Sequence, residues 1–207
     1  MARQTIDRYV YRYPALTMQA TGIDPSDVPN HENAYPWSGV LSRVDEPSAK
    51  PPGGAEGHHV ILPREVVRHR LNDLTGMPLN VDPVSGYRDH AKGHPIGVIL
   101  GAEIKGKDLW VHGLLYKKYW PDEVATIQNH KPVLGLSYEI GSCDIEDTSA
   151  KVWKLKDFRF TGASCLLKTS AAYGSKTSIA AAATRPDCWT PIMRQLRQQG
   201  RRLAGLA

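Results

Sequence analysis

One serine in the sequence has the setting that a catalytic nucleophile needs. Ser137 lies in "PVLGLSYEI", residues 132–140, a stretch whose composition predicts a strand. Strand alternation places Ser137 on one face with Gly135 and Glu139, opposite an apolar face made of Leu134, Leu136, Tyr138 and Ile140. An accessible hydroxyl on a rigid strand suits nucleophilic attack. Serine is also common on solvated strand faces, so this stretch alone favours the simpler structural explanation.

A serine nucleophile requires a base, and two histidines stand at the start of a predicted strand. All eight histidines precede Ser137, and His90 and His94 lie in "DHAKGHPIGVI". Their spacing would suit two zinc ligands on a helix, but Gly93 and Pro95 disfavour a helix there. No cysteine or glutamate pattern completes a metal site. The sequence therefore predicts neither a metal nor another cofactor, and either histidine taken singly could be an exposed polar residue.

Strands dominate the elements that would position these residues. The residue patterns predict strands, two of them joined as a hairpin by "KGKD", at residues 37–44, 77–82, 94–104, 109–117, 132–145 and 151–167. One helix is expected at 62–76, with Pro63 in its first turn and Gly76 at its end. A second is expected at 120–130, opened by Pro121. This order predicts an α+β, β-rich fold: a closed or nearly closed, mostly antiparallel barrel flanked by a few helices.

Composition divides the chain into three parts. Residues 1–34 are polar and turn-rich, and we expect them to form an extended N-terminal arm. Residues 35–173 hold nearly all of the periodic pattern and form the predicted domain. Residues 174–207 begin with the small-residue linker "GSKTSIAAAATRPD" and end in a basic tail. A length of 207 residues is enough for one domain of this kind with its tails.

The net charge of +5 is concentrated in that tail. Residues 185–202 carry five arginines against Asp187, which accounts for four of the five net positive charges. Such a tail makes only weak, sequence-independent contacts with polyanions. A nucleic-acid-binding protein is disfavoured, because no interleaving of aromatic and basic residues marks a base-stacking surface. The sequence also lacks an apolar run near 18 residues and an apolar leader, and its three cysteines are scattered. We therefore expect no membrane partner and reduced thiols in the cytoplasm.

Four motifs in a fixed order make the sequence resemble a family of viral proteases. "DHAKGHPIGVI" is followed by "LWVHGLLY", by "WPDEVATIQNHKPVLGLSYEI" and by "FRFTGASCLLKTSAAY", over about residues 78–173. This order is similar to that of the prohead (capsid maturation) proteases of tailed bacteriophages, relatives in fold of the herpesvirus assembly proteases. The family pattern has a histidine beside an acid, about five residues before a "PIG"-like strand start. A hairpin, a helix and a strand with serine in an "LS" context follow.

The resemblance implies a serine endopeptidase and the residues that carry its reaction. Ser137 would be the nucleophile, and His90, which precedes it by 47 residues, would be the base. His94 fits the pattern less well but stays open. His90 would take the proton of Ser137, which attacks a peptide carbonyl, and water would release the acyl-enzyme. Backbone N–H groups around Gly162 and Ala163 are the expected oxyanion donors.

The third member of the site follows less directly from the resemblance. The herpesvirus relatives have a second histidine after the serine, but no histidine follows Ser137 here. Many phage members have an acid in the last strand, where this chain has Gly162. Asp157 is the remaining acid on that predicted strand and shares alternation parity with Trp153 and Leu155, so a partly buried carboxylate in need of a partner is expected there. It is therefore the candidate to orient His90, and an ordinary exposed strand acid is the alternative. The other acids considered are Asp89, Glu139 and Asp144.

The resemblance also implies a biological setting. Family members cleave capsid and scaffolding proteins, and often themselves, inside the immature shell. The expected substrates are therefore the phage major capsid protein and scaffolding protein, and the expected location is the prohead in the host cytoplasm. A homodimer is compatible with this family. The alternative is a non-catalytic virion structural or decoration protein on a protease-like barrel, in which Ser137→Ala would leave every behaviour intact.

Overall fold

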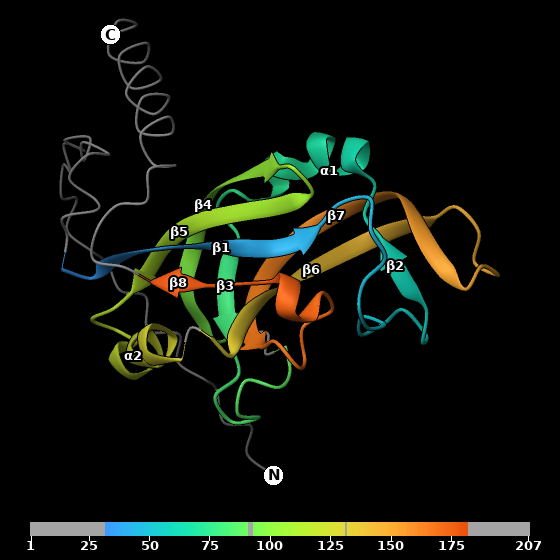
Figure 1. Ribbon diagram of the computed structural model, residues 1–207. Coiled ribbons are helices and arrows are strands. Elements are labelled where there is room, and N and C mark those ends of the chain that lie inside the picture. The colour runs from blue at the N-terminus through green and yellow to red at the C-terminus, as the bar shows by residue number, and fades with distance from the viewer. Residues whose placement is uncertain (1–31, 91–92, 131, 182–207) are drawn as a thin grey trace, which may run out of the picture.

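The computed structural model describes residues 32–90, 93–130 and 132–181 (Figure 1). Strands make up most of the regular structure in these ranges, as the residue patterns predict. The elements in chain order are β1 (Ala34–Arg43), β2 (His59–Ile61), α1 (Arg64–Arg70), the 3-10 helix η2 (Leu71–Leu74), β3 (Pro78–Val81), β4 (Pro95–Lys105), β5 (Asp108–Tyr116), α2 (Pro121–Asn129), β6 (Leu134–Ile145), β7 (Val152–Leu167), the 3-10 helix η3 (Gly174–Lys176) and β8 (Ala180–Ala181).

A single mixed sheet holds these strands. Its order is β2-β7-β3-β4-β5-β1-β8, and β6 pairs with β7 outside this path. β2 and β3 run parallel to β7, whereas the other strand pairs are antiparallel. The long strand β7 is therefore the common neighbour of β2, β3 and β6. The predicted β-rich class is confirmed, and most of its pairs are antiparallel.

The predicted barrel is not confirmed, because the sheet does not close. Among the described strands, no ladder of backbone hydrogen bonds joins β6 to β1 or β8. The segment that holds η3 and β8 contacts both β1 and β6 instead. The N–H group of Ser178 donates to the carbonyl oxygen of Val40 in β1, and the side chain of Thr177 lies against Gly135 in β6. This segment occupies the place where a closing ladder would run.

The predicted hairpin is confirmed in β4 and β5. The two strands pair up to Lys105 and Asp108, which leaves Gly106 and Lys107 as the turn. Gly106 has a φ of +59°. A two-residue turn of type II′ requires a positive φ at its first central position, where glycine is favoured.

Both predicted helices are present, with shorter α-helical parts than expected. α1 begins directly after Pro63, not at it, and passes into the 3-10 turn η2. Gly76, with a φ of +85°, follows this turn and suits the end of a helical segment. α2 begins at Pro121 and carries Asp122 and Glu123 in its first turn, where carboxylates interact favourably with the helix dipole.

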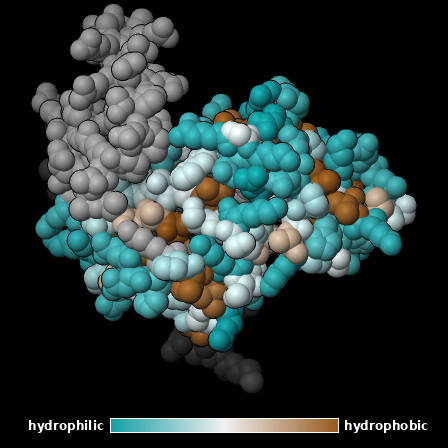
Figure 2. Space-filling model, in the orientation of Figure 1, coloured by the Kyte–Doolittle hydropathy of each residue, from teal (hydrophilic) through white to brown (hydrophobic). Residues whose placement is uncertain are grey.

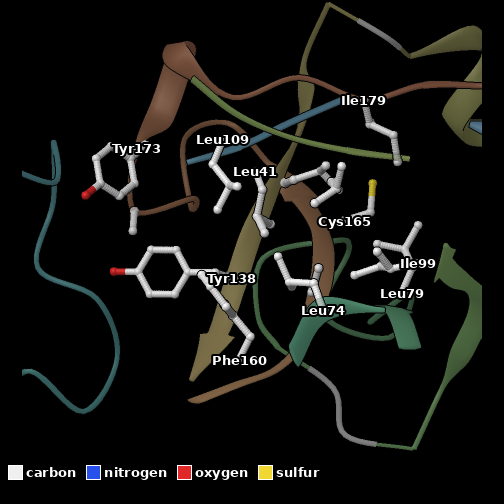
Figure 3. Packing of buried hydrophobic residues seen from close by; sticks show 14 of the residues in the cluster. Leu41, Leu74, Leu79, Ile99, Leu109, Tyr138, Phe160, Cys165, Tyr173 and Ile179 are labelled. Carbon is white, nitrogen blue, oxygen red and sulfur yellow. The ribbon is translucent and has the colours of Figure 1, made fainter. Parts of the chain in front are cut away.

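The hydrophobic core is formed by side chains from most of the strands. Figure 3 shows labelled core residues that include Leu41 of β1, Leu79 of β3 and Tyr138 of β6. Burial raises the pKa of the Cys165 thiol to about 12, so this cysteine packs as a protonated, unreactive side chain. Cys143 is a free, exposed thiol.

Residues 174–181, which composition assigns to the linker, are part of the fold. β8 pairs with β1, and Ile179 and Ala181 are each only 2% exposed. The domain therefore extends beyond residue 173. Residues 1–31 of the predicted arm and the tail from residue 182 onward lie outside the described residues.

Polar side chains cover most of the surface that faces the viewer in Figure 2, and hydrophobic residues occupy small separate areas of it. Within the described ranges, no helix combines the length and the apolar character that crossing a membrane requires.

Gly39→Ala is expected to destabilise the protein through the C-terminal segment. A Cβ atom at Gly39 would lie 2.0 Å from the backbone carbonyl oxygen of Ser178, so the backbone at Ser178 would have to move. We expect the free energy of unfolding, measured by urea denaturation, to fall by about 1–3 kcal/mol. Gly53→Ala is the matched control, since nothing lies within 4 Å of its added Cβ. Equal stability of the two variants would contradict this packing role.

Candidate active site

Ser137 lies in β6 where the sheet borders a cleft. Its cross-strand partner in β7 is Ser164, and Glu139 lies two residues further along the same face of the strand. Ser137 is only 5% exposed, so it does not lie on a solvated strand face, the alternative explanation of this serine. The serine instead lines a cleft of about 540 Å³. A ligand would reach the hydroxyl through this cleft.

The loop between β3 and β4 carries His90 and is held by its own side chains. Asp82 Oδ1 accepts hydrogen bonds from the N–H groups of Val84 and Ser85. The hydroxyl oxygen of Ser85 accepts in turn from the N–H groups of two later residues, Arg88 and Asp89. These short-range contacts fold the loop back toward the sheet and so bring His90 to the cleft.

The same loop is tied to β7 through a strained residue. Tyr87 has a φ of +64°, which is unfavourable for a side chain of this size and costs about 1–2 kcal/mol. Its carbonyl oxygen accepts a hydrogen bond from the N–H group of Leu167, at the end of β7. The chain holds this conformation three residues before His90, which sets the direction in which the loop approaches Ser137.

His90 contacts both Ser137 and Glu139. Its Nε2 atom lies 3.1 Å from Ser137 Oγ, and its Nδ1 atom lies 3.2 Å from Glu139 Oε1. An ionised carboxylate can only accept, so Nδ1 donates its hydrogen to Glu139, and in the neutral ring Nε2 is left to accept from Ser137. This arrangement is the one that a general base needs for a serine nucleophile.

The electrostatics of Glu139 favour its ionised form. Burial raises the pKa of Glu139. The hydrogen bonds from His90, Ser164 and Asn80 lower it, as does the charge of His90. These effects outweigh burial, so the pKa lies below its ordinary value of 4.5. The side chain of Glu139 is 11% exposed, and that of His90 is 33% exposed. A carboxylate that is partly buried, ionised and hydrogen-bonded is well suited to hold an imidazole ring in place.

Gly162 makes room for this carboxylate. It lies directly opposite Glu139 in the pairing of β6 with β7, and a Cβ atom at Gly162 would lie 3.0 Å from Glu139 Oε2. Gly162 is the position at which the resemblance would have placed an acid. Here the carboxylate comes from the neighbouring strand and fills the space left by the missing side chain.

The predicted role of Asp157 is contradicted by its contacts. Both of its carboxylate oxygens accept hydrogen bonds from Arg70 of α1, at 2.6–2.9 Å, and this hydrogen bonding is the main reason that the pKa of Asp157 lies below its ordinary value. Strand alternation predicted the wrong face for Asp157 because the register of the β6–β7 pairing shifts beside it. Ile145 pairs with Leu155, whereas Asp144, the preceding residue of β6, pairs with Asp157, two residues further along β7. This irregularity breaks the alternation of faces along β7.

The other candidates also lie outside the contact chain. His94 packs against Trp120, the residue directly before α2, with ring centroids 4.3 Å apart, so of the two histidines only His90 meets Ser137. The side chain of Asp89 accepts a hydrogen bond from the backbone N–H of His90 and does not bind its ring. Asp144 lies opposite Asp157 in the outer part of the β6–β7 pair.

The expected oxyanion donors do not lie in the cleft. Ala163 pairs with Leu79 of β3 on one side and with Tyr138 of β6 on the other, so its N–H group is directed at a neighbouring strand. Gly162 is likewise an interior residue of β7, opposite Glu139. Neither residue lines the cleft, so the structure does not bring these two expected donors to Ser137, and the assignment of the oxyanion donors stays a prediction.

The cleft changes character along its length. Near Ser137 it is lined by the charged loop residues Arg88 and Asp89. Further away its lining is mostly apolar and includes Pro51, Ile145 and Trp153. Such a cleft suits an extended chain segment with apolar side chains. No group of three or more His, Cys, Asp or Glu side chains in the described part of the chain is arranged to hold a metal ion.

Sequence reasoning ranked Glu139 too low and missed Ser164 and Asn80. A usable signal for Glu139 was present, because it has the same strand parity as Ser137 and lies only two residues away. No comparable signal marked Ser164 and Asn80, whose importance comes from the pairing of β3, β7 and β6. Strand pairing of this kind cannot be read from one segment of sequence.

Comparisons with known proteins find similarity at the level of structure. No protein-family model matches the sequence, and no curated protein matches it. Similar solved structures include the KSHV protease in complex with a hexapeptide phosphonate inhibitor, with a TM-score of 0.43, 13% identity and coverage of 72% of this chain and 65% of that chain. The varicella-zoster virus protease has a TM-score of 0.32 and 13% identity, with coverage of 66% and 67%.

The capsid assembly protease of bacteriophage T4 is also similar, with a TM-score of 0.34, 13% identity and coverage of 63% of this chain and 97% of that chain. For comparison, the match to the KSHV protease spans 65% of the length of that protease.

The contribution of Glu139 to stability should depend on pH in a defined direction. Because its pKa in the folded protein lies below the ordinary 4.5, the contribution is fully present above that value and is lost as the pH falls through the folded pKa. We expect the difference in free energy of unfolding between wild type and Glu139→Gln to persist down to about pH 5 and to shrink below about pH 4.5. Urea denaturation across this range measures it. A difference already lost near neutral pH would contradict a lowered pKa.

Proposed function

We propose that this chain is a serine endopeptidase in which Ser137 is the nucleophile, His90 the general base and Glu139 the residue that orients His90. The observation that carries the proposal is the continuous contact from Ser137 Oγ to His90 Nε2, and from His90 Nδ1 to Glu139 Oε1. Glu139 replaces Asp157 as the third member. The three side chains come from a strand and a loop that are distant in sequence, and they meet at a cleft large enough for a peptide.

The reaction follows from the hydrogen-bond roles of these groups. His90 Nε2 takes the proton of Ser137 as Oγ attacks the peptide carbonyl carbon, and the imidazolium that forms is stabilised by the Glu139 carboxylate. His90 then gives its proton to the leaving amine, and the acyl group remains on Ser137. A water molecule, deprotonated by His90, attacks the acyl-enzyme and restores the free serine.

The sequence resemblance suggests the substrates. We propose that the chain cleaves phage capsid and scaffolding proteins within the prohead, and that it also cleaves itself. The mainly apolar outer cleft supports an extended polypeptide as the substrate rather than a small charged molecule. A non-catalytic virion protein would have no use for a buried carboxylate aimed at a histidine that in turn faces a serine.

A matched pair of carboxylate-to-amide substitutions tests the proposed site. Glu139→Gln should lower the rate of peptide cleavage by about 10²- to 10⁴-fold, because the amide lacks the negative charge that stabilises the imidazolium and can present an N–H donor to Nδ1, which favours the wrong tautomer of His90. Asp157→Asn makes the same chemical change in a residue that binds Arg70 and should leave the rate within about twofold of wild type. The assay is cleavage of coexpressed capsid and scaffolding proteins, followed by peptide turnover.

Ser137→Ala is the control for catalysis itself, and it should abolish cleavage. Labelling with a fluorophosphonate, followed by peptide mapping, should find the label on Ser137. Cleavage by Ser137→Ala at the wild-type rate would assign the activity to another enzyme. If wild type is inactive and Glu139→Gln, Asp157→Asn and Ser137→Ala behave in the same way, the non-catalytic structural alternative is favoured.

Self-processing should remove the basic tail beyond the folded segment. Residues 174–181 pack into the protein, so we expect the cut after Ala181 and not within the packed part of the linker. Mass spectrometry after coexpression with capsid and scaffolding proteins should find a shortened wild-type chain and a full-length Ser137→Ala chain. Equal trimming of both would assign the cut to a host protease.

A further inference from the structure

A row of buried polar residues crosses the sheet at the level of the nucleophile. Asn80 of β3 pairs with Ser164 of β7, and Ser164 pairs with Ser137 of β6. Residues directly opposite one another share a face of the sheet. The exposed fractions of the three are 4%, 0% and 5%. Such a row needs hydrogen-bond partners, because a buried polar group without one costs about 1–3 kcal/mol.

The carboxylate of Glu139 is the partner that this row meets. The hydroxyl of Ser164 donates to Glu139 Oε1 at 2.6 Å, the oxygen that His90 Nδ1 also approaches. Asn80 contributes a hydrogen bond that favours the ionised carboxylate. On the remaining side, Gly162 leaves space for Oε2. One carboxylate oxygen is therefore shared between the general base and a fully buried serine.

Another serine shows that burial alone does not create such a contact. Ser42 of β1 is also 0% exposed, yet its hydroxyl has no hydrogen-bond partner among the described residues. A buried serine can thus serve only to fill space in this protein. Ser164 differs from Ser42 because its hydroxyl makes a short hydrogen bond to the Glu139 carboxylate. Ser42 is therefore the matched control for Ser164.

We propose that Ser164 is a positioning residue of the protease: its hydroxyl, assisted by Asn80, fixes the Glu139 carboxylate in the orientation that holds the Nδ1–H group of His90 and leaves Nε2 facing Ser137. The inference rests on the proposed function. Ser164 touches neither the substrate nor the reacting atoms and acts only through Glu139.

Loss of this hydroxyl has two physical consequences. The carboxylate would lose a strong donor at a buried position and become free to rotate away from His90. Its ionised form would also lose stabilisation, so protonation would begin at a higher pH. Among the described residues, the titratable group in contact with the carboxylate is His90 from the loop. From β3 and β7 it meets the uncharged Asn80, Ser164 and Gly162.

The experiment compares Ser164→Ala with Ser42→Ala. Ser164→Ala should lower kcat by about 10- to 100-fold, the equivalent of losing one charge-assisted hydrogen bond, with KM within about twofold of wild type. The acid limb of its pH–rate profile should differ from that of wild type, because the ionised form of Glu139 is less stabilised. Ser42→Ala should retain the kcat and the pH profile of wild type. Equal kcat values and pH profiles in the two variants would overturn the proposal.

A double-mutant cycle separates positioning from a general packing defect. In the Glu139→Gln background, Ser164→Ala should change kcat by less than about twofold, because the group through which it acts is already gone. If kcat of the double mutant fell by the product of the two single-mutant factors, the proposal would be overturned. Ser164→Thr, which keeps a hydroxyl, should recover most of the activity. If Ser164→Ala does not fold, the Ser164→Thr variant and the cycle built on it decide the question.

The tautomer of His90 supplies a readout that does not depend on activity. Nitrogen-15 NMR should find the ring proton on Nδ1 in wild type and in Ser42→Ala, and a mixture of tautomers in Ser164→Ala. An unchanged tautomer in Ser164→Ala would overturn the proposal. An inactive wild type with no label on Ser137 would instead overturn the proposed protease function, so the two failures are distinguishable.

Discussion

The pairing of β6 with β7 in one register is the interaction on which the whole site depends. It sets Ser137 opposite Ser164 and Glu139 opposite Gly162. Because side chains alternate between faces, a slip by one residue would turn the serine and the glutamate into the core. Tyr138 is 6% exposed and packs within the core, so the apolar face opposes such a slip. The hydrophobic pattern that stabilises the fold therefore also sets the chemistry of the opposite face.

The proposed catalytic groups are divided between strand β6 and the loop that joins β3 to β4. Ser137 and Glu139 lie on a strand that pairs along its length, whereas His90 lies on a loop held by turn contacts and by the strained residue Tyr87. Precision of the nucleophile and the carboxylate thus comes from the sheet. The base needs a second anchor, and its contact with the buried carboxylate provides one. This dependence explains why the third residue matters more here than it would beside a base on a strand.

Local patterns predicted most of the elements and the pair formed by His90 and Ser137, because strand alternation, turn glycines and helix-opening prolines act over a few residues. The error at Asp157 arose where the pairing register between β6 and β7 shifts, which no composition signal marks. The barrel expectation is not confirmed, because closure depends on where residues 174–181 pack, and this short segment carries no periodic pattern. Contacts among Asn80, Ser164 and Glu139 join three strands and follow only from the tertiary pairing.

The position of β7 between β3 and β6 also determines when the site can exist during synthesis. Asn80 and His90 leave the ribosome first, Ser137 and Glu139 follow, and Ser164 comes last. Until β7 has been made, β3 and β6 have no common neighbour to bring them together. Chains fold from the N-terminus as they emerge, yet in this topology the earlier strands cannot assemble the site alone. With this strand order the candidate site can form only after β7 has been made, so an activity of the kind proposed would appear late in synthesis.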